Sequence, residues 1–134
     1  MRYKFRGKTT SDGLWEYGSL WIESGKYYIN GTDNNWWEVI PETVGQYTGL
    51  NDKNKNEIYD GDIVRLLCQE NRGEWKDFEV VGKVVFAREF LQFLVADKTG
   101  YIEMTNNENY EILEVEVLGN VFENPELLES EVIK

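Results

Sequence analysis

The residues of this chain best suited to chemistry are acidic and amide side chains that cluster before its middle. Asp52, Asn54 and Asn56 match the first three ligand positions of a calcium-binding loop, which holds the ion through side-chain oxygens. Such a loop has Gly at its sixth position and a bidentate Glu at its twelfth, whereas this chain has Glu57 and Ile63 there. We therefore predict no metal site in this segment.

Glu57, Asp60 and Asp62 form a second candidate group. Neighbouring carboxyl groups can act as a general acid and a general base when their environments separate their pKa values, and such a pair would support a hydrolase. Gly61, between Asp60 and Asp62, is typical of a tight turn. We favour the interpretation that the two aspartates cap this turn, and we predict no catalytic residue.

The amino-acid composition excludes several common kinds of active site. The chain has 134 residues, no His and one Cys, so a Ser-His-Asp or Cys-His arrangement is impossible within it, and a structural zinc site lacks its usual ligands. Gly45 and Gly49 are not followed by the Gly-Lys-Ser/Thr of a phosphate-binding loop. We predict a non-enzymatic protein with no cofactor. Cys68 lies in an apolar run, and we interpret it as a small buried side chain.

The chain is strongly acidic, with 14 basic and 25 acidic residues and a net charge of −11. Binding to duplex nucleic acid needs a basic face, so we exclude the duplex as a partner. Many of the acids fall near the C-terminus: Glu103, Glu108, Glu111, Glu114, Glu116, Glu123, Glu126, Glu129 and Glu131. Two interpretations stay open, a solvated surface that favours solubility or a surface that imitates nucleic acid and occupies a basic host protein.

Alternating apolar and polar residues, separated by Gly, Asn and Asp, predict an all-β chain with one short helix. Residues 1–42 should form a small antiparallel sheet, with strands at 14–17, 19–22, 26–29 and 36–40. Residues 43–134 should form a small SH3-like barrel with strands at 62–69, 77–87, 90–97, 100–104 and 110–122, followed by a helix at 124–132. The boundary is predicted at 41–44, because Pro41 ends the first block.

Three local details of the second block can be predicted. The alternation that runs from Phe78 to Phe86 is interrupted at Val81 and Gly82, which indicates a bulge. Asn124 and Pro125 are residues that favour the start of a helix. A regular strand with one face in water is predicted from two alternating sets: Ile112, Glu114 and Glu116, and Leu113, Val115 and Val117.

The first block is rich in aromatic residues, which have two interpretations. Aromatic pairs across strands stabilise small sheets, or else some of the rings project outward toward a partner. We favour a core or an interface between copies of the chain. Trp36 and Trp37 are adjacent in a predicted strand, where consecutive side chains face opposite sides, so one of the two is a candidate interface residue.

Three stretches carry a recognisable pattern. The longest contains Tyr47, Thr48, Gly49, Leu50, Asp52, Asn54, Glu57, Ile58, Tyr59, Gly61 and Asp62, followed by Ile63 and Val64. The second, within residues 117–128, contains Gly119, Asn120, Asn124 and Pro125, and the third is Lys4-Phe5-Arg6. Together they resemble the YopX family of bacteriophage and prophage proteins. The chain departs from the family at Lys55, where Gly is frequent, and residues 12–37 match no close family pattern.

This resemblance implies a mostly β, oligomeric protein encoded by a phage or prophage, with no established activity. No run of about 18 apolar residues is present, and the basic N-terminus lacks the apolar core of a signal peptide. We expect a cytoplasmic protein of the bacterial host cell, not bound to membrane. It should act as an accessory protein that forms homo-oligomers and binds a host or phage protein. The alternatives are an acidic inhibitor that imitates nucleic acid and a carboxylate-dependent hydrolase.

Overall fold

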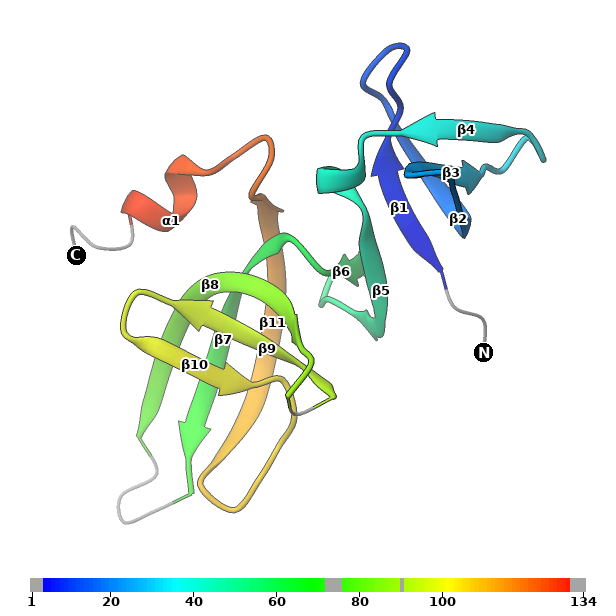
Figure 1. Cartoon of the computed structure of the whole chain (residues 1–134). Coiled ribbons are helices and arrows are strands. Elements are labelled where there is room, and N and C mark those ends of the chain that lie inside the picture. Colours follow the sequence, from blue (N-terminus) through cyan, green and yellow to red (C-terminus); the bar gives the residue numbers. More distant parts are fainter. Residues whose placement is uncertain (1–3, 72–75, 90, 131–134) are drawn as a thin grey trace. The chain divides into compact units, whose positions relative to one another are not determined.

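A computed structural model of the chain confirms the predicted all-β fold with a short C-terminal helix (Figure 1). It describes residues 4–71, 76–89 and 91–130. The chain divides into two compact units, Met1–Thr48 and Gly49–Lys134. Among the described residues, no helix has the length and apolar character needed to cross a membrane.

The first unit is built mainly from an antiparallel meander. Its elements are β1 (Phe5–Lys8), β2 (Trp15–Glu23), β3 (Lys26–Asn30), β4 (Trp36–Val39), the 3-10 turn η1 (Pro41–Thr43) and the start of β5 (Gly45–Asn51). The turn between β2 and β3 consists of Ser24 and Gly25, which both have positive φ (52° and 79°). A two-residue hairpin turn of this kind matches the twist of the strands and fixes their register.

The sheet of the first unit curls until the end of β4 meets the end of β1. Residues 8–10, at the end of β1, form hydrogen bonds with residues 38–40 at the end of β4. Gly7 permits this approach, because a Cβ atom there would lie only 2.9 Å from the Cβ of Val39. The side chains of Ile29 and Val39 are almost fully buried within the curl.

The boundary between the units lies beyond the predicted position of 41–44, because the first unit extends to Thr48. Gly45 and Gln46 pair with Arg6 and Phe5 of β1, so the start of β5 is part of the first sheet. β5 then continues into the second unit, where it neighbours β6 (Glu57–Tyr59). One strand therefore contributes to both units.

The second unit is a curved five-stranded antiparallel sheet with the order β10-β9-β8-β7-β11 (Figure 1). Its strands are β7 (Asp62–Glu70), β8 (Asp77–Ala87), β9 (Gln92–Asp97), β10 (Gly100–Glu103) and β11 (Tyr110–Asn120). The core consists of Ile58, Val64, Leu66, Cys68, Val84, Val95 and Met104. The helix α1 (Glu126–Ser130) begins two residues after the predicted start at 124, and residues 131 and 132 of the predicted helix lie outside the described part of the chain.

The predicted bulge at Val81 and Gly82 is wrong. β8 pairs with β7 in unbroken register through both residues. A Cβ atom on Gly82 would lie 2.4 Å from the carbonyl oxygen of Ala96 in β9. Glycine at this position therefore reflects the close approach of the neighbouring strand, which the sequence alone does not distinguish from a bulge.

The strand predicted near 110–122 is present as β11, but the regular alternation predicted for residues 112–117 is wrong, because the register of β11 against β7 shifts at Leu113 and again at Leu118. Each shift adds one residue to β11, as in a β-bulge. Leu113 and Leu118 are exposed, and Ile112 packs against the core together with Val115 and Val117.

Candidate functional site

The side chain of Asp52 joins the turn after β5 to strand β11. Its Oδ1 accepts hydrogen bonds from the backbone N–H groups of Asn54 and Asn56, both at 2.9 Å. Its Oδ2 accepts the backbone N–H of Val117, also at 2.9 Å, and the side chain is 94% buried. Burial works to raise the pKa of Asp52, but the hydrogen bonds from Val117, Asn56 and Asn54 outweigh it and lower the pKa.

The turn that contains Asp52 covers the outer edge of β11. β11 is the last strand of its sheet, and the open backbone groups of an edge strand invite pairing with other chains. Lys53 donates its backbone N–H to the carbonyl of Val115 at 2.9 Å, next to the bond between Val117 and Asp52. The segment that resembles the start of a calcium loop is thus engaged in hydrogen bonds within the fold.

Asp62 holds the tight turn between β6 and β7. Its Oδ2 accepts the backbone N–H of Tyr59 at 2.7 Å, and its side chain is buried. The hydroxyl of Tyr59 donates to Oε1 of Glu57 at 2.8 Å. Asp60 and Gly61 form the turn itself, and Gly61 has a φ of 97°. Two of the three candidate carboxylates, Glu57 and Asp62, therefore both bind Tyr59 in a structural arrangement.

The second motif stretch forms the end of β11. The Oδ1 of Asn120 accepts hydrogen bonds from the two backbone N–H groups at positions 122 and 123. The Oδ1 of Asn124 accepts the backbone N–H of Asn120 at 3.2 Å, so this side chain faces β11, and α1 begins after Pro125. A Cβ atom on Gly119 would overlap Oδ1 of Asn124, which accounts for glycine there.

The other motif residues lie on β5 and β6. Ile58 is fully buried in the core of the second unit, whereas Leu50 is exposed. The Nζ of Lys4 lies 5.5 Å from the centre of the Tyr47 ring, and Thr48 and Gly49 stand on either side of the boundary between the units. Most of the motif residues thus have roles in turns, in packing or in covering a strand edge.

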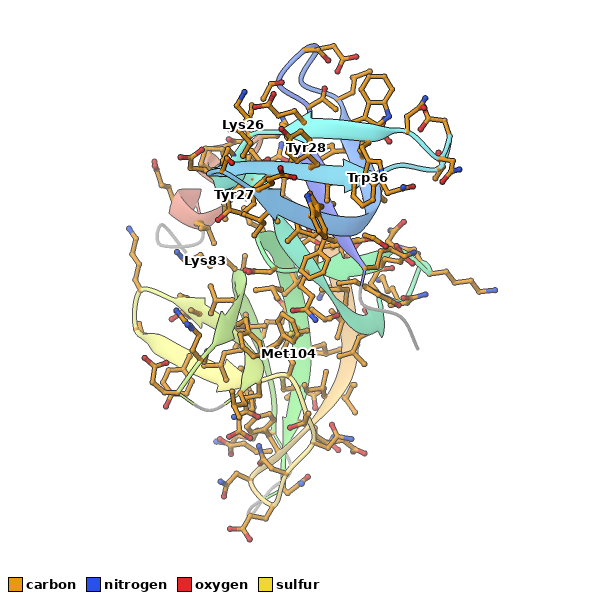
Figure 2. The ribbon with its side chains drawn as sticks, turned by 45° about the vertical axis from the view of Figure 1, so that its right-hand side comes forward. Lys26, Tyr27, Tyr28, Trp36, Lys83 and Met104 are labelled. Atoms are coloured by element: carbon orange, nitrogen blue, oxygen red, sulfur yellow. The ribbon has the colours of Figure 1, made fainter. Side chains whose placement is uncertain are left out.

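A concave surface of a different kind lies on the meander of the first unit. Trp21 of β2 stands directly opposite Tyr28 of β3, and Trp36 of β4 stands opposite Asn30, one step further along the same face. Trp21 and Trp36 are 55% and 51% exposed. In Figure 2, Tyr28 lies between Lys26 and Trp36 on this face. We call the surface formed by Trp21, Tyr28 and Trp36 the aromatic face.

The aromatic face is hollowed. The hollow has a volume of about 700 Å³, and its lining consists of Trp21, Glu23, Ser24, Lys26, Tyr28 and Trp36. Glu23 and Lys26 are opposite each other at the hairpin end of β2 and β3, so one acid and one base stand at the same rim. The hollow therefore combines apolar walls with a few polar groups, as ligand-binding surfaces do.

The N–H groups of both exposed indoles have partners within the sheet. Nε1 of Trp21 donates to Oε1 of Glu23 at 3.0 Å. Nε1 of Trp36 donates to the side-chain oxygen of Asn30 at 3.2 Å, in the amide orientation that satisfies both side-chain atoms of Asn30. These bonds orient the rings, and their faces are the surfaces that a ligand can contact.

The two candidate interface residues differ in exposure. Trp36 belongs to the aromatic face, whereas Trp37 stands opposite Ile29 and is only partly exposed. Nε1 of Trp37 donates to Oδ1 of Asp33 at 3.2 Å. Trp36 is therefore the more accessible of the two, and Trp21 is an exposed tryptophan that we did not predict as a site residue.

The two units also differ in charge. The first unit contains 5 basic and 6 acidic residues, which gives it a net charge of −1. The second contains 9 basic and 19 acidic residues, which gives it a net charge of −10. The acidity of the chain thus belongs almost entirely to the second unit, and the aromatic face lies on the nearly neutral one.

Comparison with known proteins agrees with the pattern of the motif residues. The YopX protein family matches residues 4–129, which include all three motif stretches. None of the curated proteins compared with the chain matches it. The match covers nearly the whole sequence and both units. The chain belongs to the YopX protein family.

Proposed function

We propose that this protein is a phage- or prophage-derived accessory protein that acts without catalysis, by self-association and by binding another protein. The observation that carries this proposal is the aromatic face, where Trp21 and Trp36 are each more than half exposed above a hollow. Tryptophan and tyrosine are enriched at the centres of protein interfaces, and exposed apolar patches mark interaction sites. The aromatic face is the surface that takes the partner protein.

The charge distribution favours self-association through the first unit. Two copies that met through their second units would bring a net charge of −10 against −10, whereas the first units carry −1 each. Leu14 and Ile22 of the first unit are 63% and 52% exposed. Ile22 follows Trp21 in β2 and so faces the opposite side of the strand. These residues offer apolar surface for a second copy and leave the hollow for a partner.

The cytoplasm of the bacterial host cell is the proposed location. Cysteine usage supports it, because a single buried thiol fits a reducing compartment better than an oxidising one.

Light scattering tests self-association. The mass measured for the wild-type protein should be a defined multiple of the 15.7 kDa of one chain. This multiple should be the same at low and at high salt. Ile22→Ser should lower the mass, whereas Leu113→Ser, a matched change of an exposed residue on the second unit, should leave it unchanged. A monomer under all conditions, or association that requires high salt, would contradict self-association through the first unit.

A second candidate function is favoured by the charge of the second unit. Its outer face carries Glu79 on β8 and Glu114 and Glu116 on β11, with Arg65 bound among them at 2.8 to 3.2 Å. Such a face could imitate the phosphates of a nucleic acid and occupy a basic protein. A complex of this kind should weaken sharply as salt rises, and salt-insensitive binding would rule it out.

A further inference from the structure

We infer that the aromatic face binds a proline-rich segment of another protein in the polyproline II conformation. The inference rests on the proposed protein-binding function and specifies the chemistry of the partner. Grooves lined by aromatic rings are a recurring way of recognising such segments. The preformed extended helix of the segment loses little conformational entropy when it docks.

The arrangement of the rings suits this ligand. Trp21 and Tyr28 face each other across β2 and β3, with their Cβ atoms roughly 5 Å apart. Trp36 lies on β4, diagonally across from Tyr28, and the two Cβ atoms are roughly 8 Å apart. A polyproline II helix returns to the same side every three residues, about 9 Å. The spacing of Tyr28 and Trp36 is close to this repeat, so these two rings can contact successive prolines on one side of the segment, and Trp21, opposite Tyr28, widens the contact with one of them.

The polar groups at the rim match the backbone of such a segment. Polyproline II has no internal hydrogen bonds, and proline has no N–H, so the segment presents mainly carbonyl acceptors. Around the hollow stand the ammonium of Lys26 and the hydroxyls of Ser24 and Tyr28, all of which can donate. The indole N–H groups of Trp21 and Trp36 already have partners, which leaves their ring faces for the prolines.

Charge argues for a neutral or basic segment. Glu23 and Lys26 stand opposite each other at the rim, so the hollow has no net charge, and Glu23 is the group that an arginine or lysine beside the prolines would contact. A single-stranded nucleic acid could also stack on the rings. Its phosphates, however, would meet a hollow whose one basic residue, Lys26, stands opposite Glu23.

The composition of the chain excludes its own sequence as the source of the segment. Its two prolines, Pro41 and Pro125, are far apart in the sequence, so a second copy offers no proline-rich stretch. The partner at the aromatic face is therefore a different protein.

Isothermal titration calorimetry on the full chain tests the inference. The probe is a twelve-residue polyproline peptide with arginine at each end, and the matched control peptide has alternating Gly and Ser in place of the prolines. The proline peptide should bind at one site per chain, and Trp36→Ala and Trp21→Ala should each weaken it by at least about tenfold. Tyr101→Ala, which removes a ring of similar exposure from the second unit, should leave the affinity unchanged.

Several results would overturn the inference: equal affinity for the Gly-Ser peptide, no loss of affinity in Trp36→Ala, or tighter binding of oligothymidylate. Trp36→Phe, which keeps an aromatic ring, should retain binding, and circular dichroism of each variant separates lost binding from lost fold. Absence of peptide binding by a chain that still forms the oligomer would reject the proline-rich ligand alone. A monomeric chain that binds the peptide would instead reject the proposed self-association.

Discussion

The carboxylate of Asp52 accepts a hydrogen bond from the backbone N–H of Val117, a residue 65 positions further along the chain. This bond connects the turn after β5 with the edge of β11, two segments that belong to separate motif stretches. Lys53 strengthens the same connection, since its Nζ lies 3.0 Å from Oε2 of Glu114. The turn and the edge strand therefore stabilise each other.

Replacing Asp52 should strongly destabilise the protein. Asp52→Ala leaves the N–H groups of Asn54, Asn56 and Val117 without their acceptor, and we expect the free energy of unfolding to fall by about 3 kcal/mol. Urea denaturation measures this. The matched control is Asp33→Ala, because the Asp33 carboxylate also accepts a backbone N–H, from Asn35, but at an exposed turn. Equal losses in the two variants would show that the bond to β11 contributes little.

The free energy of unfolding should depend on pH in the acidic range, and Asp52 should contribute to this dependence. Its pKa in the folded protein lies below the ordinary value of about 3.9, so its contribution is complete above that pH and is lost as the pH falls through the folded pKa. In Asp52→Asn the dependence of unfolding free energy on pH should be shallower in this acidic range. Hydrogen bonds, above all from the backbone N–H of Asn35, also lower the pKa of Asp33, but Asp33 is exposed and solvent screens its charge, so Asp33→Asn should change the slope less. Parallel pH profiles for wild type and Asp52→Asn would contradict the prediction.

Lys55→Gly should stabilise the protein. Lys55 has a φ of 70°, a left-handed conformation that glycine adopts without the steric cost of a side chain. The relief of strain exceeds the extra flexibility of glycine in the unfolded chain, and we expect a gain of about 0.5 kcal/mol. Lys53→Gly, the same change two positions earlier, should instead destabilise, because it removes the contact with Glu114. The midpoints of thermal unfolding of both variants, compared with that of wild type, test these two expectations.

Cys68 should be chemically inert in the folded protein. Its side chain is fully buried in the core of the second unit, and burial raises the pKa of the thiol to about 11. Ellman's reagent at pH 8 should therefore react with one thiol per chain in denaturing urea and only as fast as the protein unfolds in native buffer. Rapid reaction under native conditions would mean that the core opens locally around Cys68.

The sequence was sufficient for features that depend on local pattern. Alternation predicts most strands of the second unit, and the Ser24-Gly25 turn implies that Glu23 pairs with Lys26 and hence Trp21 with Tyr28. That register could have placed Trp21 and Tyr28 on one face, although we singled out only Trp36 and Trp37. Two of the three residues of the aromatic face, Trp21 and Tyr28, are thus predictable from the turn.

Features that depend on neighbours distant in the sequence could not be predicted. Gly82 resembles a bulge in the sequence but is required by the close approach of Ala96. The bulges at Leu113 and Leu118 move these leucines to the surface, which their apolar character does not suggest. The role of Asp52 depends on Val117, and nothing within the turn indicates that partner.

The closure of the first unit has a consequence for its folding kinetics. The hairpins of β2, β3 and β4 join residues that are close in sequence, so they can form early. The bonds between residues 8–10 and 38–40 enclose the whole meander and cannot form until these strands are in place. We expect the entropy of closing this long loop to set the slow step of folding. If this closure takes place in the transition state, a substitution at Gly7, where β1 approaches Val39, should slow folding. If the closure follows the transition state, the same substitution should instead speed unfolding.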